Sequence, residues 1–263
     1  MLANLQNLFR YRALIQSLVA RELKARYRGS LLGYFWSFIN PLLLLLVYSF
    51  VFTYVLQNQT EGIQPYALFM FCGILPWTWF SSSLLESSNV LVAGGNLIKK
   101  VLFPAEILPI VTVLAGLVNF CLGLPILAAF LIYYRVPVTP SDLLWLPVLV
   151  VLQCLMTLGL AFVVASLTVL FRDVRDLLAN LLTLWFFATP IIYPLWSAPA
   201  GVQRVLALNP MTYLIVSYQE ILFREGPYRD WQRVLGIGAV SLLVFLAGYF
   251  VFNRLRDTFA EEV

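Results

Sequence analysis

Residues 21–41 have the sequence RELKARYRGSLLGYFWSFINP, which changes abruptly from a basic segment to an uncharged one. Four cations fall within residues 21–28, and no charged residue follows them until Glu61. A bilayer-crossing helix needs about 20 predominantly apolar residues, and this uncharged run is long enough to supply them. The stretch therefore predicts a membrane protein whose first span directly follows a cationic segment.

The composition of the whole chain supports this interpretation. The 263 residues are 61% hydrophobic and only 11% charged, whereas about 25% of the residues of a soluble domain are charged. There is no histidine, and the three cysteines lie singly in apolar runs, so neither a metal site nor a disulfide framework is expected. The sequence also lacks a phosphate-binding loop of the G-x-x-x-x-G-K-[ST] type. We therefore expect an all-α integral membrane protein that binds no metal, nucleotide or other cofactor itself.

Charged residues divide the chain into six uncharged runs that are long enough to cross a bilayer. The expected spans are residues 33–56, 66–90, 107–133, 143–170, 177–194 and 234–252. Together they form one expected six-span domain, residues 29–263. A cytoplasmic interface helix, residues 1–28, is expected to precede it.

An even number of spans places both termini on the same side of the membrane. With that side cytoplasmic, only five of the 17 cations are external, namely Arg135, Arg204, Arg224, Arg229 and Arg233. The positive-inside rule favours this orientation. A further uncharged run, residues 205–219, is short, and counting it as a span would place Arg254 and Arg256 outside. We therefore expect residues 195–233 to form an external excursion between the fifth and sixth spans.

The N-terminal segment has the periodicity of an amphipathic helix. One side carries Leu8, Tyr11, Ile15, Leu18, Val19 and Leu23, and a narrow stripe opposite carries Arg10, Ser17, Arg21, Lys24 and Arg28. Arg12 and Arg26 depart from the pattern because they fall on the apolar side. The helix is expected to lie on the inner membrane surface, with its cations near anionic headgroups.

The external excursion contains the sequence NPMTYLIVSYQEILF, residues 209–223. Asn209 is a suitable N-cap, and Pro210 suits the first helical position. We expect a helix, including Tyr213 and Tyr218, that dips into the membrane from outside without crossing it. Such a helix either closes a pathway as an external gate or only packs at the interface.

Two short inner loops carry compact charge. Residues 94–107 contain Lys99, Lys100 and Glu106, and residues 171–178 contain Arg172, Asp173, Arg175 and Asp176. These loops either set the topology or dock a cytoplasmic partner. Glu86, near the inner end of the second span, is expected to pair with a lysine of the first loop or to face a polar pathway. A role as a proton relay is the less favoured alternative.

Aromatic residues cluster near the expected span boundaries, where interfacial belts are common. Tyr48 and Phe52 lie one turn apart in the first span, and Trp77 lies in the second. These three residues either pack and anchor the helices or line a path on which sugar rings stack.

Four ordered blocks of the chain resemble a known family. They are RELKARYRGSLLGYFWSFINPLL, LIKKVLFPAEILP, LFRDVRDLLANLLTLWFFATPIIYP and LNPMTYLIVSYQEILF. The sequence is similar to the membrane subunits of type-2 ABC exporters for polysaccharides or polyol phosphates, which include O-antigen, capsule and teichoic-acid permeases. The resemblance extends over nearly the whole chain.

The resemblance implies an assembly. Two copies of this chain, each with six spans, would form a channel between them in the bacterial cytoplasmic membrane. Two copies of a separate ATPase would bind below and hold ATP and Mg. The substrate would be a lipid-linked polymer, and no nucleic-acid partner is expected. The matching coupling elements are residues 94–106 and 172–176, and the matching external gate helices lie in residues 200–223.

The resemblance also places the loop Leu32–Gly33 near the lipid-linked pyrophosphate of the substrate. Two interpretations of this joint remain open. Gly29 and Gly33 are spaced for close helix packing. Alternatively, Arg26 and Arg28, together with the positive end of the following helix, form a pyrophosphate site.

Two other classes of membrane protein are alternatives to the exporter. An ion-coupled secondary carrier would need internal repeats and acids near mid-membrane, and a membrane-embedded glycolipid transferase would need carboxylates grouped at one interface. Neither pattern is found, because the acids are dispersed along the chain.

Overall fold

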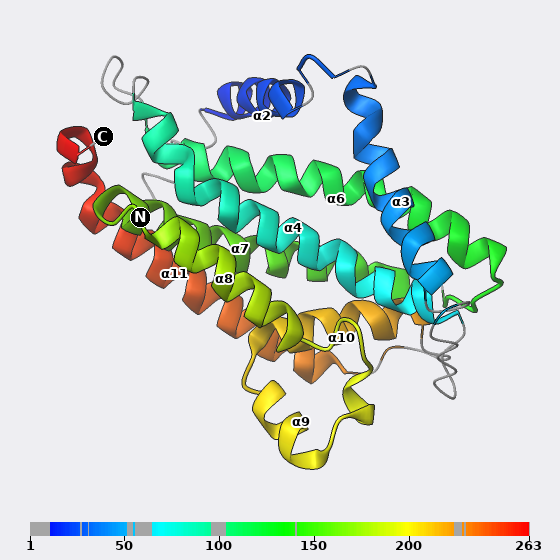
Figure 1. The fold of residues 1–263 in the computed structure, drawn as a ribbon. Helices are drawn as coiled ribbons and strands as arrows, with labels where there is room; N and C mark the ends of the chain where they lie inside the picture. Colours follow the sequence, from blue (N-terminus) through cyan, green and yellow to red (C-terminus); the bar gives the residue numbers. More distant parts are fainter. Residues whose placement is uncertain are drawn as a thin grey trace.

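The computed structural model describes residues 11–26, 28–30, 32–51, 55, 65–95, 104–139, 141–223, 228 and 230–262. The described part of the chain is helical and contains no strand (Figure 1). Its α-helices are α2 (Arg12–Arg26), α3 (Trp36–Phe50), α4 (Tyr66–Ala93), α6 (Ile107–Tyr133), α7 (Trp145–Leu170), α8 (Val174–Phe187), α9 (Ala200–Leu206), α10 (Pro210–Phe223) and α11 (Trp231–Glu262). Short 3-10 turns are η1 (Gly33–Phe35), η3 (Asp142–Leu144) and η4 (Leu195–Ser197).

Four described helical segments are long and apolar enough to cross a membrane, namely α4, α6, η3 with α7, and α11. Two expected spans have shorter helices. α3 has 15 residues, and most of the continuation of its expected span, residues 52–54 and 56, lies outside the described part. α8 has 14 residues and ends at Phe187, so residues 188–194 are turns rather than the expected helix. Pro190 explains this end, because proline lacks an N–H and disfavours helical backbone at the preceding residue.

Helix α4 lies at the centre of the fold. It packs against α6, α7, α3, α8 and α10, and most of its side chains are buried. Polar side chains fix it to both of its long neighbours. The amide of Gln153 on α7 donates to the carbonyl oxygen of Pro76 at 2.8 Å, and the indole of Trp79 donates to the carbonyl oxygen of Val113 on α6 at 3.1 Å.

Helices α7 and α11 approach each other so closely that their backbones are in contact. They run in the same direction, since Leu152 lies beside Gly238 and Gly159 beside Gly248. A Cβ atom added at Gly248 would lie 2.0 Å from the carbonyl oxygen of Gly159. Small residues of this kind let membrane helices approach each other closely.

Helix α2 lies alongside the beginning of α6 (Figure 1). Its buried Leu18 packs with Ile107 and Val111, and Tyr11 and Ile15 lie around them. The apolar side of α2 is therefore covered largely by protein, whereas the sequence predicted that it would rest on the membrane. Leu8 and Arg10 of the predicted helix lie outside the described residues.

The predicted excursion contains two short helices, α9 and α10. Helix α9 projects from the other helices at the lower edge of Figure 1. Helix α10 packs against α4 and α7, with Met211, Leu214 and Tyr218 buried. Most of the 14 residues of α10 are thus buried in protein rather than exposed to lipid.

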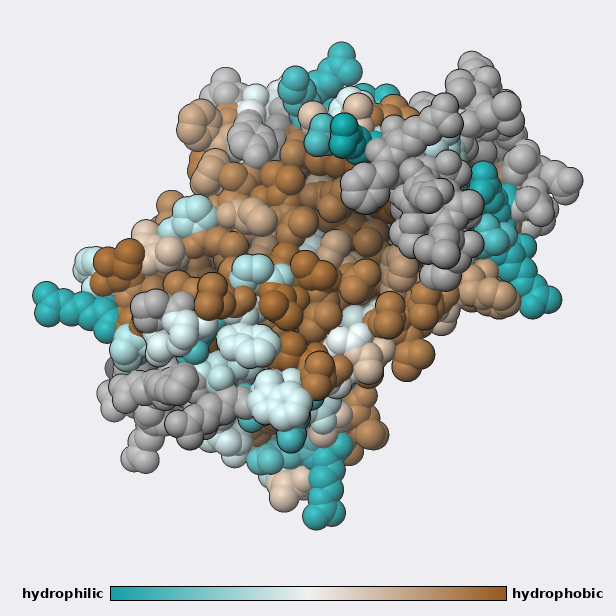
Figure 2. Space-filling view, turned by 180° about the vertical axis from the view of Figure 1, so that it is seen from behind, coloured by the Kyte–Doolittle hydropathy of each residue, from teal (hydrophilic) through white to brown (hydrophobic). Residues whose placement is uncertain are grey.

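Much of the molecular surface is apolar. Figure 2 shows a broad, mostly hydrophobic face on the side opposite to the view of Figure 1. On α11, the exposed large apolar side chains include Leu235, Leu242, Leu243 and Phe250. Because soluble monomers rarely expose large contiguous apolar patches, this surface is typical of a protein that faces lipid.

Candidate functional site

The turn between α2 and η1 is built on two glycines with left-handed backbone. Gly29 has φ +80° and Gly33 has φ +50°, a region that glycine adopts without steric cost. A Cβ atom at either glycine would meet no described atom within 4 Å. The glycines are therefore required for the turn, and the alternative of close helix packing finds no support within the described protomer. The indole of Trp36 donates to the Ser30 hydroxyl at 2.9 Å and steadies this turn.

The two arginines before this turn have different environments. Arg28 is exposed, whereas Arg26 points into the fold and donates through Nη2 to Oε2 of Glu86 on α4. The sequence predicted that Glu86 pairs with a lysine of the first inner loop or faces a polar pathway. The structure shows Glu86 paired with Arg26, and both lysines lie outside the described residues. The ion pair explains why Arg26 departs from the amphipathic pattern, because it connects α2 to α4.

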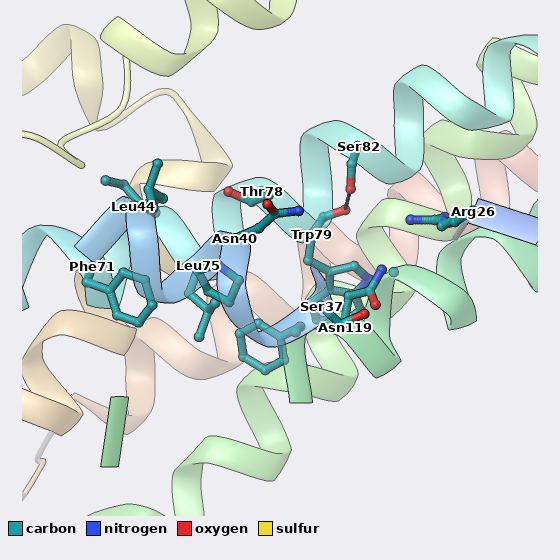
Figure 3. Close-up of a pocket in the computed structure, with 14 residues that line it drawn as sticks. Arg26, Ser37, Asn40, Leu44, Phe71, Leu75, Thr78, Trp79, Ser82 and Asn119 are labelled. Atoms are coloured by element: carbon teal, nitrogen blue, oxygen red, sulfur yellow. Dashed lines mark hydrogen bonds between the residues drawn. The ribbon is translucent and has the colours of Figure 1, made fainter. Parts of the chain in front are cut away.

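A groove with a cavity of about 350 Å³ begins at Arg26 and runs between α3, α4 and α6 (Figure 3). Its lining is polar near Arg26, where Ser37, Ser82 and Asn119 lie. It is apolar at the far end, which Leu44, Phe71 and Leu75 line. The groove is therefore amphipathic along its length.

Asn209 connects the beginning of α10 to the end of α8. Its Oδ1 accepts hydrogen bonds from the backbone N–H of Met211 at 3.0 Å and the indole of Trp185 at 2.9 Å. Its Nδ2 donates to the carbonyl oxygen of Ala188 and to the hydroxyl of Thr189, each at 3.0 Å. The side chain thus uses both its acceptor and its donor groups, and the predicted N-cap is present, with Pro210 as the first residue of α10.

A second polar cluster fixes the end of α10 near the beginnings of η3 and α11. The buried Asp142 accepts a hydrogen bond from the backbone N–H of Tyr228 at 3.0 Å. The Tyr228 hydroxyl is bonded to Ser217 on α10 at 3.0 Å, and burial raises the pKa of Tyr228. Arg233 of α11 donates to Glu220 of α10 at 2.7 Å. Both termini of α10 are therefore held by side-chain hydrogen bonds.

The described ends of the first charged loop and the second charged loop lie at the same end of the helix bundle. Leu91 and Ala105, which flank the first loop, share a core cluster with Val169 before the second loop and with Phe252 of α11. Glu106 of the first loop lies 3.8 Å from Arg256 of α11. In the second loop, all four charged side chains are exposed, namely Arg172, Asp173, Arg175 and Asp176. Lys99 and Lys100 lie outside the described residues.

Comparison with known proteins identifies the family. Residues 13–223 match the model of the ABC-2 type transporter family. The chain belongs to this family. Over its full length, it is 42% identical to the whole O-antigen export system permease protein RfbA of Myxococcus xanthus. It is 32% identical to the permease of that name from Klebsiella pneumoniae over 92% of this chain and 91% of the relative. It is 24% identical to the polysialic acid transport protein KpsM of Escherichia coli over 89% of this chain and 92% of the relative.

Two aromatic residues predicted to line a channel contribute to packing within this ABC-2 membrane subunit. Trp77 is only 6% exposed and contacts the rings of Phe80, Trp185 and Phe186. Tyr48 is partly buried against the main core. Phe52 lies outside the described residues. A channel-lining role for these three residues stays a prediction.

Sequence reasoning missed the partners of Asn209 and the cluster around Tyr228 in this ABC-2 subunit. Trp185 and Asn209 are 24 residues apart in the chain, and Asp142 and Tyr228 are 86 apart. The periodicity of apolar residues does not predict which residues far apart in the chain come into contact. One available signal was Asp142 itself, because an acid beside a long apolar run needs a partner if it is buried.

Proposed function

We propose that this chain is the permease subunit of an ATP-driven exporter that moves a lipid-linked polysaccharide of the O-antigen class across the bacterial cytoplasmic membrane. The observation that carries the proposal is the 42% identity over the full length of an O-antigen export permease. The more distant similarity to a polysialic acid transport protein supports the broader class of polysaccharide export.

In the proposed assembly, two copies of this chain enclose the channel, and two ATPase subunits bind ATP and Mg beneath them. Each copy crosses the membrane six times with both termini in the cytoplasm, so that α3 and α8 belong to the first and fifth spans. The exposed charges of residues 172–176 and the loop around Glu106 contact the ATPase. Their common position at one end of the bundle supports this docking role.

At the inner entrance, the pyrophosphate of the substrate binds beside the turn that contains Leu32 and Gly33. The exposed Arg28 supplies a charge-assisted contact, and α3, which follows the 3-10 turn η1, presents its positive end. Arg26, at the end of α2, adds positive charge on the protein side of this site while it remains paired with Glu86. This arrangement predicts that Arg28→Ala raises the substrate concentration needed for half-maximal stimulation of ATP hydrolysis.

The measurement is substrate-stimulated ATPase activity in reconstituted membranes. Arg21→Ala is the matched control, because Arg21 is likewise an exposed cation but lies within α2, two helical turns before the glycine turn. Equal half-maximal concentrations for both variants and the wild type would assign Arg28 to membrane anchoring alone.

At the outer end, α9 and α10 close the channel and open it when the polymer passes. The hydrogen bonds of Asn209 support a gate that moves with α8, because they join the end of that helix to the beginning of α10. A single cysteine at Arg204, in a background without native cysteines, should react with an impermeant thiol reagent that is added outside. Reaction from the cytoplasmic side alone would contradict both the orientation and the gate.

Deletion of the gene in its natural host tests the function as a whole. We expect polysaccharide to disappear from the cell surface while its lipid-linked form accumulates in the cytoplasmic membrane. Complementation should require both this chain and an active ATPase partner. Unchanged surface polysaccharide would refute the proposal, and loss of the lipid-linked form itself would instead indicate a glycolipid transferase.

A further inference from the structure

We propose that the groove between α3, α4 and α6 holds one zwitterionic phospholipid of the surrounding bilayer. Its phosphate lies at Arg26, its ammonium lies at Glu86, and one hydrocarbon chain follows α4. This inference goes beyond the proposed function, because the occupant is a resident lipid rather than the exported polymer.

The lining of the groove changes from polar at one end to apolar at the other (Figure 3). Its Arg26 end also contains Ser37 and Asn119, and its far end contains Leu44 and Phe71 (Figure 3). The lining residues of α4 extend from Phe71 to Ser82, a rise of about 16 Å at 1.5 Å per residue. Half of the hydrocarbon core of a bilayer is about 15 Å thick. The groove thus matches one lipid chain whose headgroup lies near α2.

The polar end of the groove has charges of both signs, which complement the two charges of a zwitterionic headgroup. Arg26 is positive, its partner Glu86 is negative, and Glu22, one turn earlier on α2, also acts electrostatically on Glu86. A purely anionic headgroup would satisfy Arg26 but would place a second negative charge beside Glu86. A phosphate joined to an ammonium group offers an opposite charge to each member of the pair.

The groove contains buried polar atoms that have no hydrogen-bond partner among the described residues. Arg26 Nε is a donor without an acceptor, and Asn119 Oδ1 is an acceptor without a donor. Buried polar groups in proteins are nearly always hydrogen-bonded. A zwitterionic headgroup offers acceptor oxygens for Arg26 Nε and N–H donors for Asn119 Oδ1. Small displacements of the two side chains toward such a headgroup would satisfy both atoms.

The size of the cavity limits its occupant to a small molecule or to part of a larger one. About 350 Å³ lies near the lower limit of small-molecule pockets, which are roughly 300–1,000 Å³. The apolar lining at the far end favours a hydrocarbon chain over sugars in this space.

Lipid retention tests the proposal. The chain is purified from cells that contain phosphatidylethanolamine and phosphatidylglycerol but synthesise no lipid-linked polymer, and bound lipids are counted by native mass spectrometry. We expect one phosphatidylethanolamine per protomer to resist delipidation. Thr78→Trp should abolish retention, because Thr78 lines the groove but is otherwise exposed. The matched control Thr78→Val should retain the lipid.

Glu86→Gln tests the headgroup assignment. Loss of a charge-assisted hydrogen bond should weaken phosphatidylethanolamine binding about tenfold, and the remaining cation should then favour phosphatidylglycerol. Three results with the wild-type protein would overturn the proposal: no retained lipid, a preference for phosphatidylglycerol, or retention of a polyprenyl lipid. Equal retention by Thr78→Trp and Thr78→Val would also overturn it, because the lipid would then lie outside the groove.

Discussion

Substitution of Asn209 by alanine should destabilise the protein by detaching α10 from the end of α8. The substitution removes the N-cap of α10 and leaves the Trp185 indole without its acceptor. It also removes the donor to the carbonyl oxygen of Ala188 and to the Thr189 hydroxyl. Loss of an N-cap costs about 0.5–2 kcal/mol, and each further hydrogen bond contributes about 0.5–1.5 kcal/mol.

The sum of these terms is an upper limit, because Asn209 is only half-buried and water replaces part of the lost bonding. We expect the free energy of unfolding to fall by about 1–3 kcal/mol. The measurement is denaturation of the purified protein in mixed micelles with increasing denaturing detergent, followed by tryptophan fluorescence and by circular dichroism.

Two control variants test whether the lost stability comes from the specific hydrogen bonds of Asn209 or from the loss of any asparagine side chain. Asn209→Asp keeps the acceptor for Met211 and Trp185 but loses the donor, so its stability should lie between those of the wild type and the alanine variant. Asn180→Ala removes an exposed amide with a single bond to the carbonyl oxygen of Asp176 at 3.1 Å, and should change stability little. If Asn209→Ala were as stable as Asn180→Ala, the idea that Asn209 joins the two helices would be refuted.

The remaining predictions concern the helix contact, the inner loop and the outer cluster. Gly248→Ala should destabilise the protein by about 1–3 kcal/mol, because its Cβ would lie 2.0 Å from the carbonyl oxygen of Gly159. In the same denaturation assay Gly236→Ala is the control, since its Cβ meets nothing within 4 Å, and equal stabilities would contradict the close backbone contact. Reversal of charge by Arg172→Glu with Asp173→Lys should reduce co-purification of the ATPase, whereas Arg204→Glu at the outer end should not; intact association would contradict the docking role. Burial raises the pKa of Tyr228 in the folded protein above the ordinary value for tyrosine, about 10. The contribution of Tyr228 to stability is therefore present below about pH 10 and is lost as pH rises through the folded pKa. In Tyr228→Phe, the free energy of unfolding should therefore fall less steeply with pH above about pH 10. An unchanged pH dependence of the free energy of unfolding would show that Tyr228 does not cause the fall.

The long apolar elements were predictable from the sequence because uncharged length is a local property. The expected spans 66–90, 107–133, 143–170 and 234–252 each lie almost entirely within an observed helix. The fifth expected span was too long, because the absence of charge was given more weight than the prolines. Pro190 ends the helix in spite of the apolar residues that follow.

Local capping was also predictable, whereas long-range pairing was not. The N-cap at Asn209 followed from its position before Pro210, and the structure confirms it. The pairing of Glu86 with Arg26 was not predicted, because this pairing depends on how α2 crosses α4 and not on separation along the chain. The departure of Arg26 from the amphipathic pattern was the useful local signal, since a cation on an apolar side needs a partner within the fold.

Reconstituted transport tests the central claim most directly. Proteoliposomes containing this chain and its ATPase partner are loaded with lipid-linked polysaccharide, and an impermeant glycosidase detects polymer that reaches the opposite side. We predict that appearance of polymer requires ATP, persists when ion gradients are dissipated, and stops when the ATPase is inactivated. Transport that depends on an ion gradient without ATP hydrolysis would contradict the account and would indicate a secondary carrier.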